Sequence, residues 1–168
     1  TAKALAEQTN QDMQLHIEDP AGSRTFLVGA DGQAQQWLLG KEYRLVRRLA
    51  LPTGVEACRV DDAYATLFVA EEGMGVWAYG ADAEGPSLRT PVALRAPHGA
   101  LKGEIAALEI LPGGLAALDE HGALHAWRRD GAAWRAQTLR VPGAQQLAPS
   151  GAGSLLVRTA QGWQAQAW

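Results

Sequence analysis

The chain has a single cysteine and no long apolar run, and each absence narrows what the protein can be. Cys58 has no partner for an intramolecular disulfide, and its apolar neighbours predict an inert, buried thiol. Because no stretch of about 18 apolar residues occurs, we expect no membrane-spanning helix. The sequence also begins without a methionine or a signal-like segment. We therefore expect a processed product or a piece of a longer protein.

An excess of positive charge is missing as well. The net charge is −3 and the pI is near 5.8, so the sequence carries no electrostatic footprint of a nucleic-acid partner. One basic cluster interrupts this balance: Lys41, Arg44, Arg47 and Arg48. Because apolar residues interleave with these four, we interpret the cluster as the solvated face of an outer strand.

Glycine and proline are plentiful, with 19 and 8 copies in 168 residues of which 47% are hydrophobic. They punctuate the sequence every few residues, which favours many short strands over long helices. The stretch from Val55 to Trp77 shows the pattern best. It reads as an apolar strand (Leu67 to Ala70), an acidic turn at 71–73 and a return strand (Gly75 to Tyr79), which together predict a hairpin.

The rest of the chain repeats this unit. The tryptophans Trp37, Trp77, Trp127 and Trp168 are 40, 50 and 41 residues apart. Each follows a glycine turn by four to six residues, and a short apolar run precedes each turn. A period of about 40–45 residues is typical of the four-stranded blades of a β-propeller.

The remaining strands can be placed in the same register. Inner strands are expected at 13–17, 55–60, 105–111 and 145–148, and outer strands at 43–50, 88–95 and 134–141. We therefore predict an all-β fold with an N-terminal arm at 1–11 and, over 12–168, a partial or open β-propeller-like array of about four four-stranded antiparallel blades. The alternative is a β-sandwich with scattered Gly-Trp pairs.

Four blades are the lower limit for a closed ring. An open arc would leave strand edges uncovered, which is an association liability. The sequence therefore predicts further blades outside these residues, closure against a second copy or a second propeller domain, or an unusually small ring.

The stretch from 55 to 77 resembles the β-propeller phytases. The matching positions are Glu56, Asp61, Asp62, Leu67, Ala70, Glu71, Glu72 and Trp77, with Ala57 and Phe68 replacing the family's Gly and Tyr. Two further segments, 26–32 and 101–108, are similar to other parts of that family's pattern. The resemblance covers roughly residues 13–141.

The resemblance implies a secreted or periplasmic bacterial enzyme that uses calcium to hydrolyse inositol hexakisphosphate, as a 3-phytase does. It assigns Glu56 and Glu72 as catalytic residues, and Glu56, Glu72 and Glu104 as metal ligands. Calcium suits a carboxylate centre because it takes six to eight oxygen ligands in flexible geometry. The resemblance also implies inositol phosphates as binding partners.

Several positions depart from the family pattern. Ala106 stands where the family has a metal-binding Glu, and Ala30 where it has a phosphate-binding Lys. No carboxylate occurs between Asp130 and Trp168. We therefore expect an incomplete N-terminal phytase-like domain with weak or no activity alone. The alternative is a non-catalytic module that binds inositol phosphates or another domain.

Other polar residues have simpler interpretations. For Glu71 a solvated turn is favoured, and Asp61 and Asp62 are expected to form a turn rather than to bind a ligand. His121 and His125 are four residues apart, but on a strand or turn they would not converge on one metal.

Overall fold

The computed structural model describes residues 13–18, 24–29, 31–151 and 153–168, with the backbone alone for 13–18. Within these residues, fifteen strands form four antiparallel sheets, which we call blades 1 to 4. Blade 1 consists of β1 (Met13–Glu18), β2 (Arg24–Gly29), β3 (Gln33–Leu39) and β4 (Tyr43–Ala50). Blade 2 consists of β5 (Val55–Asp61), β6 (Thr66–Glu71), β7 (Gly75–Gly80) and β8 (Arg89–Leu94). Blade 3 consists of β9 (Ile105–Leu111), β10 (Gly114–Asp119), β11 (Leu124–Asp130) and β12 (Ala133–Gln137). Blade 4 has three strands, β13 (Gln146–Pro149), β14 (Leu155–Thr159) and β15 (Gly162–Gln166).

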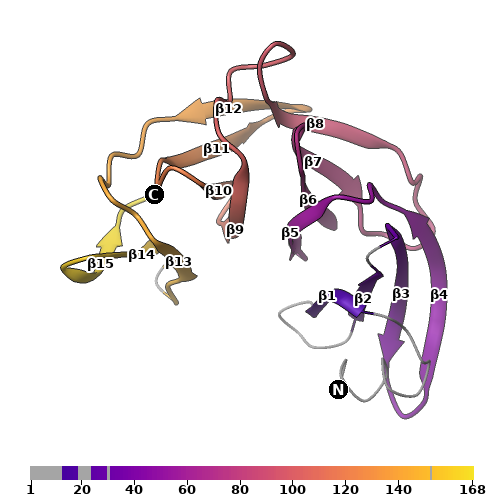
Figure 1. The fold of residues 1–168 in the computed structure, drawn as a ribbon. Coiled ribbons are helices and arrows are strands. Elements are labelled where there is room, and N and C mark those ends of the chain that lie inside the picture. Colours follow the sequence, from indigo (N-terminus) through magenta and orange to yellow (C-terminus); the bar gives the residue numbers. More distant parts are fainter. Residues whose placement is uncertain (1–12, 19–23, 30, 152) are drawn as a thin grey trace.

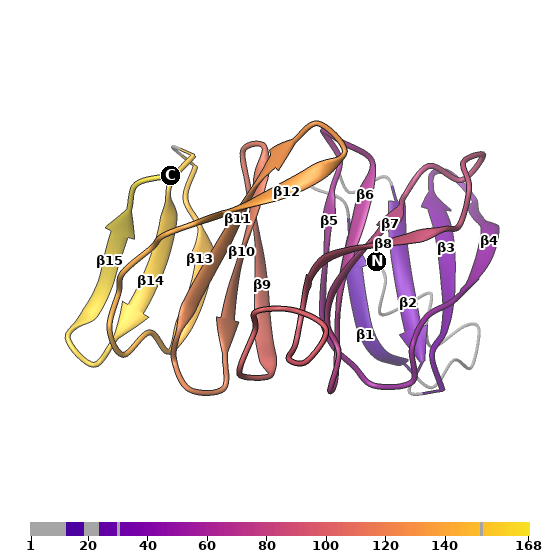
Figure 2. The ribbon, with the colours of Figure 1, turned by 90° about the horizontal axis from the view of Figure 1, so that it is seen from above.

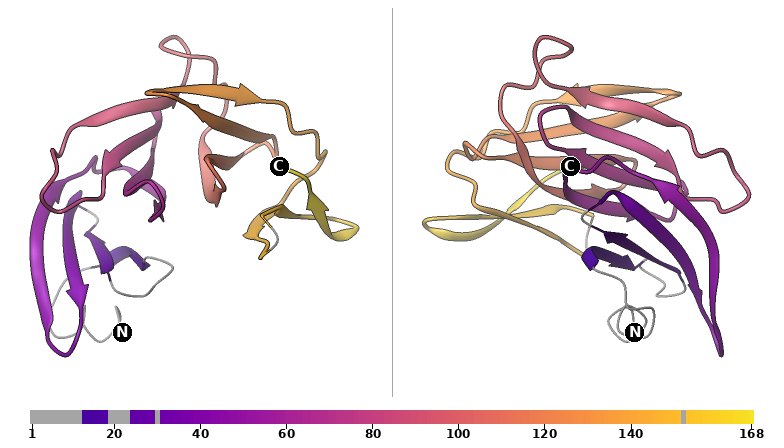
Figure 3. Two further views of the ribbon diagram at one scale, coloured as in Figure 1. Left: turned by 180° about the vertical axis from the view of Figure 1, so that it is seen from behind. Right: turned by 45° about the vertical axis from the view of Figure 1, so that its right-hand side comes forward.

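The blades follow one another in chain order around an open arc (Figure 1). The first strand of each blade lies on the concave side, and β5 packs against both β1 and β9. From above, the four sheets stand side by side along the arc (Figure 2). The view from behind shows that the two ends of the arc do not meet (Figure 3). The prediction of an open propeller is confirmed, and the β-sandwich alternative is wrong.

Local sequence explains the tight turns between the second and third strands. Gly32, Gly73 and Gly122 all adopt positive φ angles, of 79°, 75° and 77°. At Gly32 a Cβ atom would also collide with the carbonyl oxygen of Leu51. These two constraints require glycine at that position.

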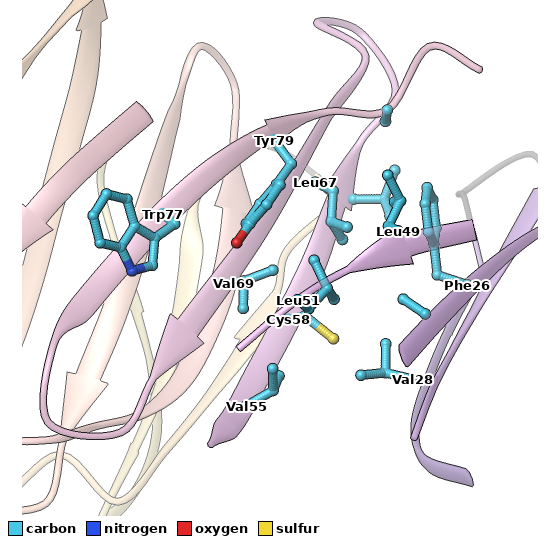
Figure 4. Close-up of a cluster of buried hydrophobic side chains, with 13 residues drawn as sticks. Phe26, Val28, Leu49, Leu51, Val55, Cys58, Leu67, Val69, Trp77 and Tyr79 are labelled. Atoms are coloured by element: carbon cyan, nitrogen blue, oxygen red, sulfur yellow. The ribbon is translucent and has the colours of Figure 1, made fainter. Parts of the chain in front are cut away.

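Each pair of neighbouring blades encloses its own hydrophobic core. Between blades 1 and 2, Phe26 and Val28 face Leu67 and Val69, with Cys58 among them (Figure 4). Two further cores fill the space between blades 2 and 3 and between blades 3 and 4. The middle strands β6 and β10 are therefore buried on both faces, which explains why their sequences are apolar without alternation.

The buried thiol and the expected strands agree with the structure. Cys58 is 2% exposed, and burial raises the pKa of its thiol to about 12. Of the expected outer strands, the third is shorter than predicted, because β12 ends at Gln137. The expected N-terminal arm at 1–11 lies outside the described residues.

The assignment of Trp168 to the repeat is wrong. Trp168 lies beyond β15, and its indole Nε1–H donates to the carbonyl oxygen of Pro112 at 2.8 Å. The tryptophan on the third strand of blade 4 is Trp163, which is 51% exposed. Spacing in the sequence suggested the wrong tryptophan, because the position of Trp168 is set by its tertiary contact with Pro112, which follows β9 of blade 3.

The basic cluster is solvated only in part. Lys41, Arg44 and Arg48 are exposed on blade 1. Arg47 is half-buried, where its guanidinium donates to Oε1 of Gln36 and to the carbonyl oxygen of Gly80. Arg47 therefore joins blade 1 to blade 2.

Among the described residues, no helix has the length and apolar character needed to cross a bilayer.

Candidate functional site

Four carboxylates lie on the face of the arc where strands β5 and β9 begin, and we call this region the acidic end: Glu56, Glu72, Glu104 and Glu120. The start of β5 lies beside the end of β6, since Val55 pairs with Glu71. Backbone hydrogen bonds join Glu72 N to Gly54 O at 2.7 Å and Glu120 N to Glu104 O at 2.9 Å. The topology therefore brings the three residues that the resemblance singled out, Glu56, Glu72 and Glu104, to one end of the molecule.

Glu104 is the best-connected of them. Its Oε1 forms an ion pair with the guanidinium of Arg95, and its Oε2 accepts the backbone N–H of Gly73 at 2.9 Å. Its own N–H donates to Oε1 of Glu120 at 3.2 Å. The side chain is 27% exposed, so these contacts are only partly screened by water. Glu104 thus joins the β6–β7 turn of blade 2 to the β10–β11 turn of blade 3.

Glu56 and Glu72 are open to solvent. Glu56 lies on β5 at a bulge between Val55 and Ala57, with its side chain exposed. Glu72 occupies the β6–β7 turn and is exposed as well. Both carboxylates are therefore available to a ligand that approaches this face of the arc.

Glu71 differs from the solvated turn residue that was expected. Its side chain is 19% exposed, and its Oε2 accepts hydrogen bonds from Nε1 of Trp77 at 2.6 Å and from Arg89 at 3.3 Å. The Arg89 guanidinium also stacks over the Trp77 ring at 3.9 Å. Glu71 therefore holds blade 2 together. Sequence reasoning missed this role because neighbours on β7 and β8 define it.

The expected turn is present: Asp61 is the last residue of β5, and Asp62 begins the β5–β6 turn. They also make ion pairs between blades, Asp61 with Arg129 at 3.7 Å and Asp62 with Arg24 at 3.5 Å. Burial of Asp61 raises the pKa of its carboxyl, and the opposing charge of Arg129 offsets this only in part. This turn is on the opposite face of the arc from the acidic end, at the other end of strand β5.

A second buried acid pairs with a histidine. Oδ2 of Asp119 lies 2.9 Å from Nε2 of His125, and Oδ1 accepts the backbone N–H groups of His121 and Ala123. Burial alone would raise the pKa of Asp119, but the hydrogen bonds from His125 and the two backbone groups outweigh it and lower the pKa. The four-residue spacing of His121 and His125 in the sequence does not indicate the pairing of His125 with Asp119.

The family model described as Phytase matches residues 26–113, just over half of the chain. The chain belongs to the phytase family. The match begins in β2 of blade 1 and ends just after β9 of blade 3, so it includes Glu56, Glu72 and Glu104. Comparison with curated protein sequences gives no match.

Solved structures support the fold of this phytase-family chain. The WD40 β-propeller domain of Doa1 matches with a TM-score of 0.59 and 12% identity, over 94% of this chain and 52% of that one. The dihydro-heme d1 dehydrogenase NirN matches with a TM-score of 0.66 and 15% identity, over 93% of this chain and 34% of that one. The designed Ika4 protein matches with a TM-score of 0.57 and 12% identity, over 94% and 91%. The chain thus spans about half of the Doa1 propeller domain and a third of NirN, and at these identities the likeness concerns the fold alone.

The donor set at the acidic end tests the calcium ion that the family resemblance implied. Calcium takes six to eight oxygen ligands. Across the described ranges, no group of three or more His, Cys, Asp or Glu side chains is placed to hold a metal ion. Both carboxylate oxygens of Glu104 already have partners in the protein. The described residues of this phytase-family chain therefore do not fit a calcium ion by themselves, and the ligand roles of Glu56, Glu72 and Glu104 stay predictions.

A cavity of about 690 Å³ lies on the opposite face of the arc, where β5, β9 and β13 of blades 2, 3 and 4 end. Its charged lining residues are Arg59, Asp61, Asp62 and Glu109. Arg59 pairs with Glu109, with 3.6 Å between Nε and Oε2. Each of the three lining carboxylates is paired with an arginine, since Asp61 also faces Arg129 and Asp62 faces Arg24, so the charges beside this cavity are largely balanced.

Proposed function

We propose that this chain forms part of a phosphohydrolase that acts on inositol hexakisphosphate, and that these four blades alone hydrolyse it weakly or not at all. The observation that carries the proposal is the family match over residues 26–113. The second half of the proposal is supported by the donor set, because the described carboxylates form no metal-binding group. In this proposal, calcium is held by ligands that these residues do not supply alone. When bound, calcium would neutralise the charge between carboxylates and phosphate groups.

Glu56 and Glu72 are the residues proposed to act on the substrate or its ions. Both are exposed at the acidic end, whereas Glu71 is engaged by Trp77 and Arg89. A Glu56→Gln substitution keeps the shape of the side chain and removes its charge. It should lower calcium-dependent phosphate release, while Glu42→Gln, at an exposed position in the β3–β4 turn, should leave it unchanged.

The incomplete arc supports a partner that continues the propeller. Blade 4 has three strands, so the edge of β15 carries backbone groups that no strand pairs within the described residues. Trp163 pairs with Arg158 and is exposed on this blade. A second propeller domain, or a second copy of the chain, would cover this edge. A secreted or periplasmic location is part of the same proposal.

The alternative is a non-catalytic module that binds inositol phosphates or another domain. The engagement of Glu104 by Arg95 favours it, because a carboxylate held in this way contributes less to a metal-dependent reaction. In this case the four blades would bind phytate without releasing phosphate.

Two experiments separate these functions. Phosphate release from phytate is measured with calcium, and again with chelator, for the polypeptide in which these residues naturally occur and for the four-blade chain. Phosphate release by the natural polypeptide that chelator abolishes supports the proposal. A natural polypeptide that releases no phosphate with calcium would contradict the proposal. Calorimetric titration of the four-blade chain with phytate tests the alternative. Heat indistinguishable from that of buffer would contradict a binding module.

A further inference from the structure

The guanidinium of Arg95 is fixed at the acidic end by the backbone. Arg95 follows β8 directly, and its N–H donates to the carbonyl oxygen of Met74 at 2.8 Å. Its Nη2 donates to the carbonyl oxygen of Lys102 at 3.4 Å, while Nη1 contacts Oε1 of Glu104. The Arg95 side chain is 27% exposed. The positive charge is therefore held at one place between blades 2 and 3.

Further acidic residues lie next to the Arg95–Glu104 pair. Glu104 donates its N–H to Oε1 of Glu120, and Glu120 donates its own N–H to the carbonyl oxygen of Glu104. Glu72 is the neighbour in sequence of Gly73, whose N–H donates to Oε2 of Glu104. Carboxylates gathered in this way repel one another unless a cation lies among them. Arg95 is the cation that the described residues place in contact with Glu104.

We infer that Arg95 is the resident cation of the acidic end, and that Glu104 is consequently a clasp between blades 2 and 3 rather than a metal ligand. An arginine side chain stays protonated at any working pH, so the pairing persists wherever the protein is folded. A divalent cation would have to displace Arg95 before it could reach Oε1 of Glu104. The inference concerns only the ion at Glu104, so it goes beyond the proposed hydrolytic function.

The clasp predicts a specific coupling between the two side chains. Arg95→Ser and Glu104→Gln should each lower the midpoint of thermal unfolding by about 2–4 °C. Because each change removes the same ion pair, the double variant should lose little more than the larger single loss. Arg44→Ser, which removes an exposed arginine of β4, is the matched control and should leave the midpoint unchanged.

If Arg95 is the resident cation, calcium should affect the unsubstituted chain and the Arg95→Ser variant differently. Millimolar calcium chloride should leave the midpoint of the unsubstituted chain where magnesium chloride leaves it. It should raise the midpoint of Arg95→Ser, because the carboxylates of that variant have lost their resident charge. Double-mutant additivity, or an Arg95→Ser variant of lowered midpoint that ignores calcium, would overturn the inference.

A calorimetric titration of the unsubstituted chain with calcium decides the question even where a variant does not fold. Heat indistinguishable from dilution supports the resident cation. Saturable heat that Glu104→Gln abolishes, or a saturable calcium-dependent rise in the midpoint of the unsubstituted chain, would show that Glu104 binds the metal despite Arg95. Phosphatase activity enters neither readout, so this result is independent of the proposed function.

Discussion

The indole Nε1–H of Trp77 donates a 2.6 Å hydrogen bond to Oε2 of Glu71, six positions earlier in the chain. Blade 3 repeats the arrangement, because His125 Nε2 lies 2.9 Å from Oδ2 of Asp119, also six positions earlier. In both blades an acid at the end of the second strand meets a nitrogen on the third strand. In this way each partly or fully buried carboxylate gains a side-chain partner on the third strand in addition to its other contacts.

Removing the Trp77 donor should destabilise blade 2. Trp77→Phe keeps most of the buried ring but removes the indole donor, so that Oε2 of Glu71 keeps its hydrogen bond from Arg89 alone of these two. The free energy of unfolding should fall by about 1–2 kcal/mol, measured by urea denaturation. Trp163→Phe is the control, since Trp163 is 51% exposed and its change should be near zero. Equal losses for the two variants would contradict the role of the hydrogen bond.

The core between blades 2 and 3 should depend strongly on Phe68. This residue is fully buried and its ring meets that of Trp134 edge-on, with centroids 5.4 Å apart. Phe68→Ala should lower the free energy of unfolding by about 3–5 kcal/mol, because it leaves a cavity. Leu88→Ala, at a position 78% exposed, should change it little. A small loss for Phe68→Ala would mean that the blades do not pack as described.

Asp119 should make stability depend on acid pH. Its pKa is lowered in the folded state, because hydrogen bonds from His125 and backbone N–H groups outweigh burial. The stabilisation is therefore complete above the ordinary carboxyl pKa of about 4 and is lost as the pH falls through the folded-state value. Comparison with Asp119→Asn by urea denaturation should show an advantage of the native chain at neutral pH that shrinks below about pH 4. An advantage that is constant with pH would contradict this.

Asp61 should show the opposite trend. Burial raises its folded-state pKa, and Arg129 compensates only in part. The contribution to stability is then greatest below the ordinary carboxyl pKa of about 4 and declines as the pH rises through the folded-state value. The free energy of unfolding of the native chain relative to Asp61→Asn should therefore increase on acidification. A relative stability that decreases on acidification would show that the ion pair with Arg129 dominates.

Much of the fold could be predicted from residues close together in the chain. The hairpin at 67–79 and the inner strands at 55–60 and 105–111 agree with β6, β7, β5 and β9. Glycine turns and apolar runs act within a few residues, so their pattern survives in a single sequence. Trp168 failed as a repeat marker because its position depends on Pro112, 56 residues away.

The sequence by itself determined the blade repeat and most of the strands, because glycine turns and apolar runs act between residues close together in the chain. Only the tertiary structure decided what each acid does. It exposes Glu56 and Glu72, engages Glu104 with Arg95, and binds Glu71 to Trp77. These outcomes depend on which side chains from neighbouring strands and blades reach the same carboxylate. Contacts between blades join residues whose spacing in the chain follows no local rule, and for this reason the sequence pattern does not encode them.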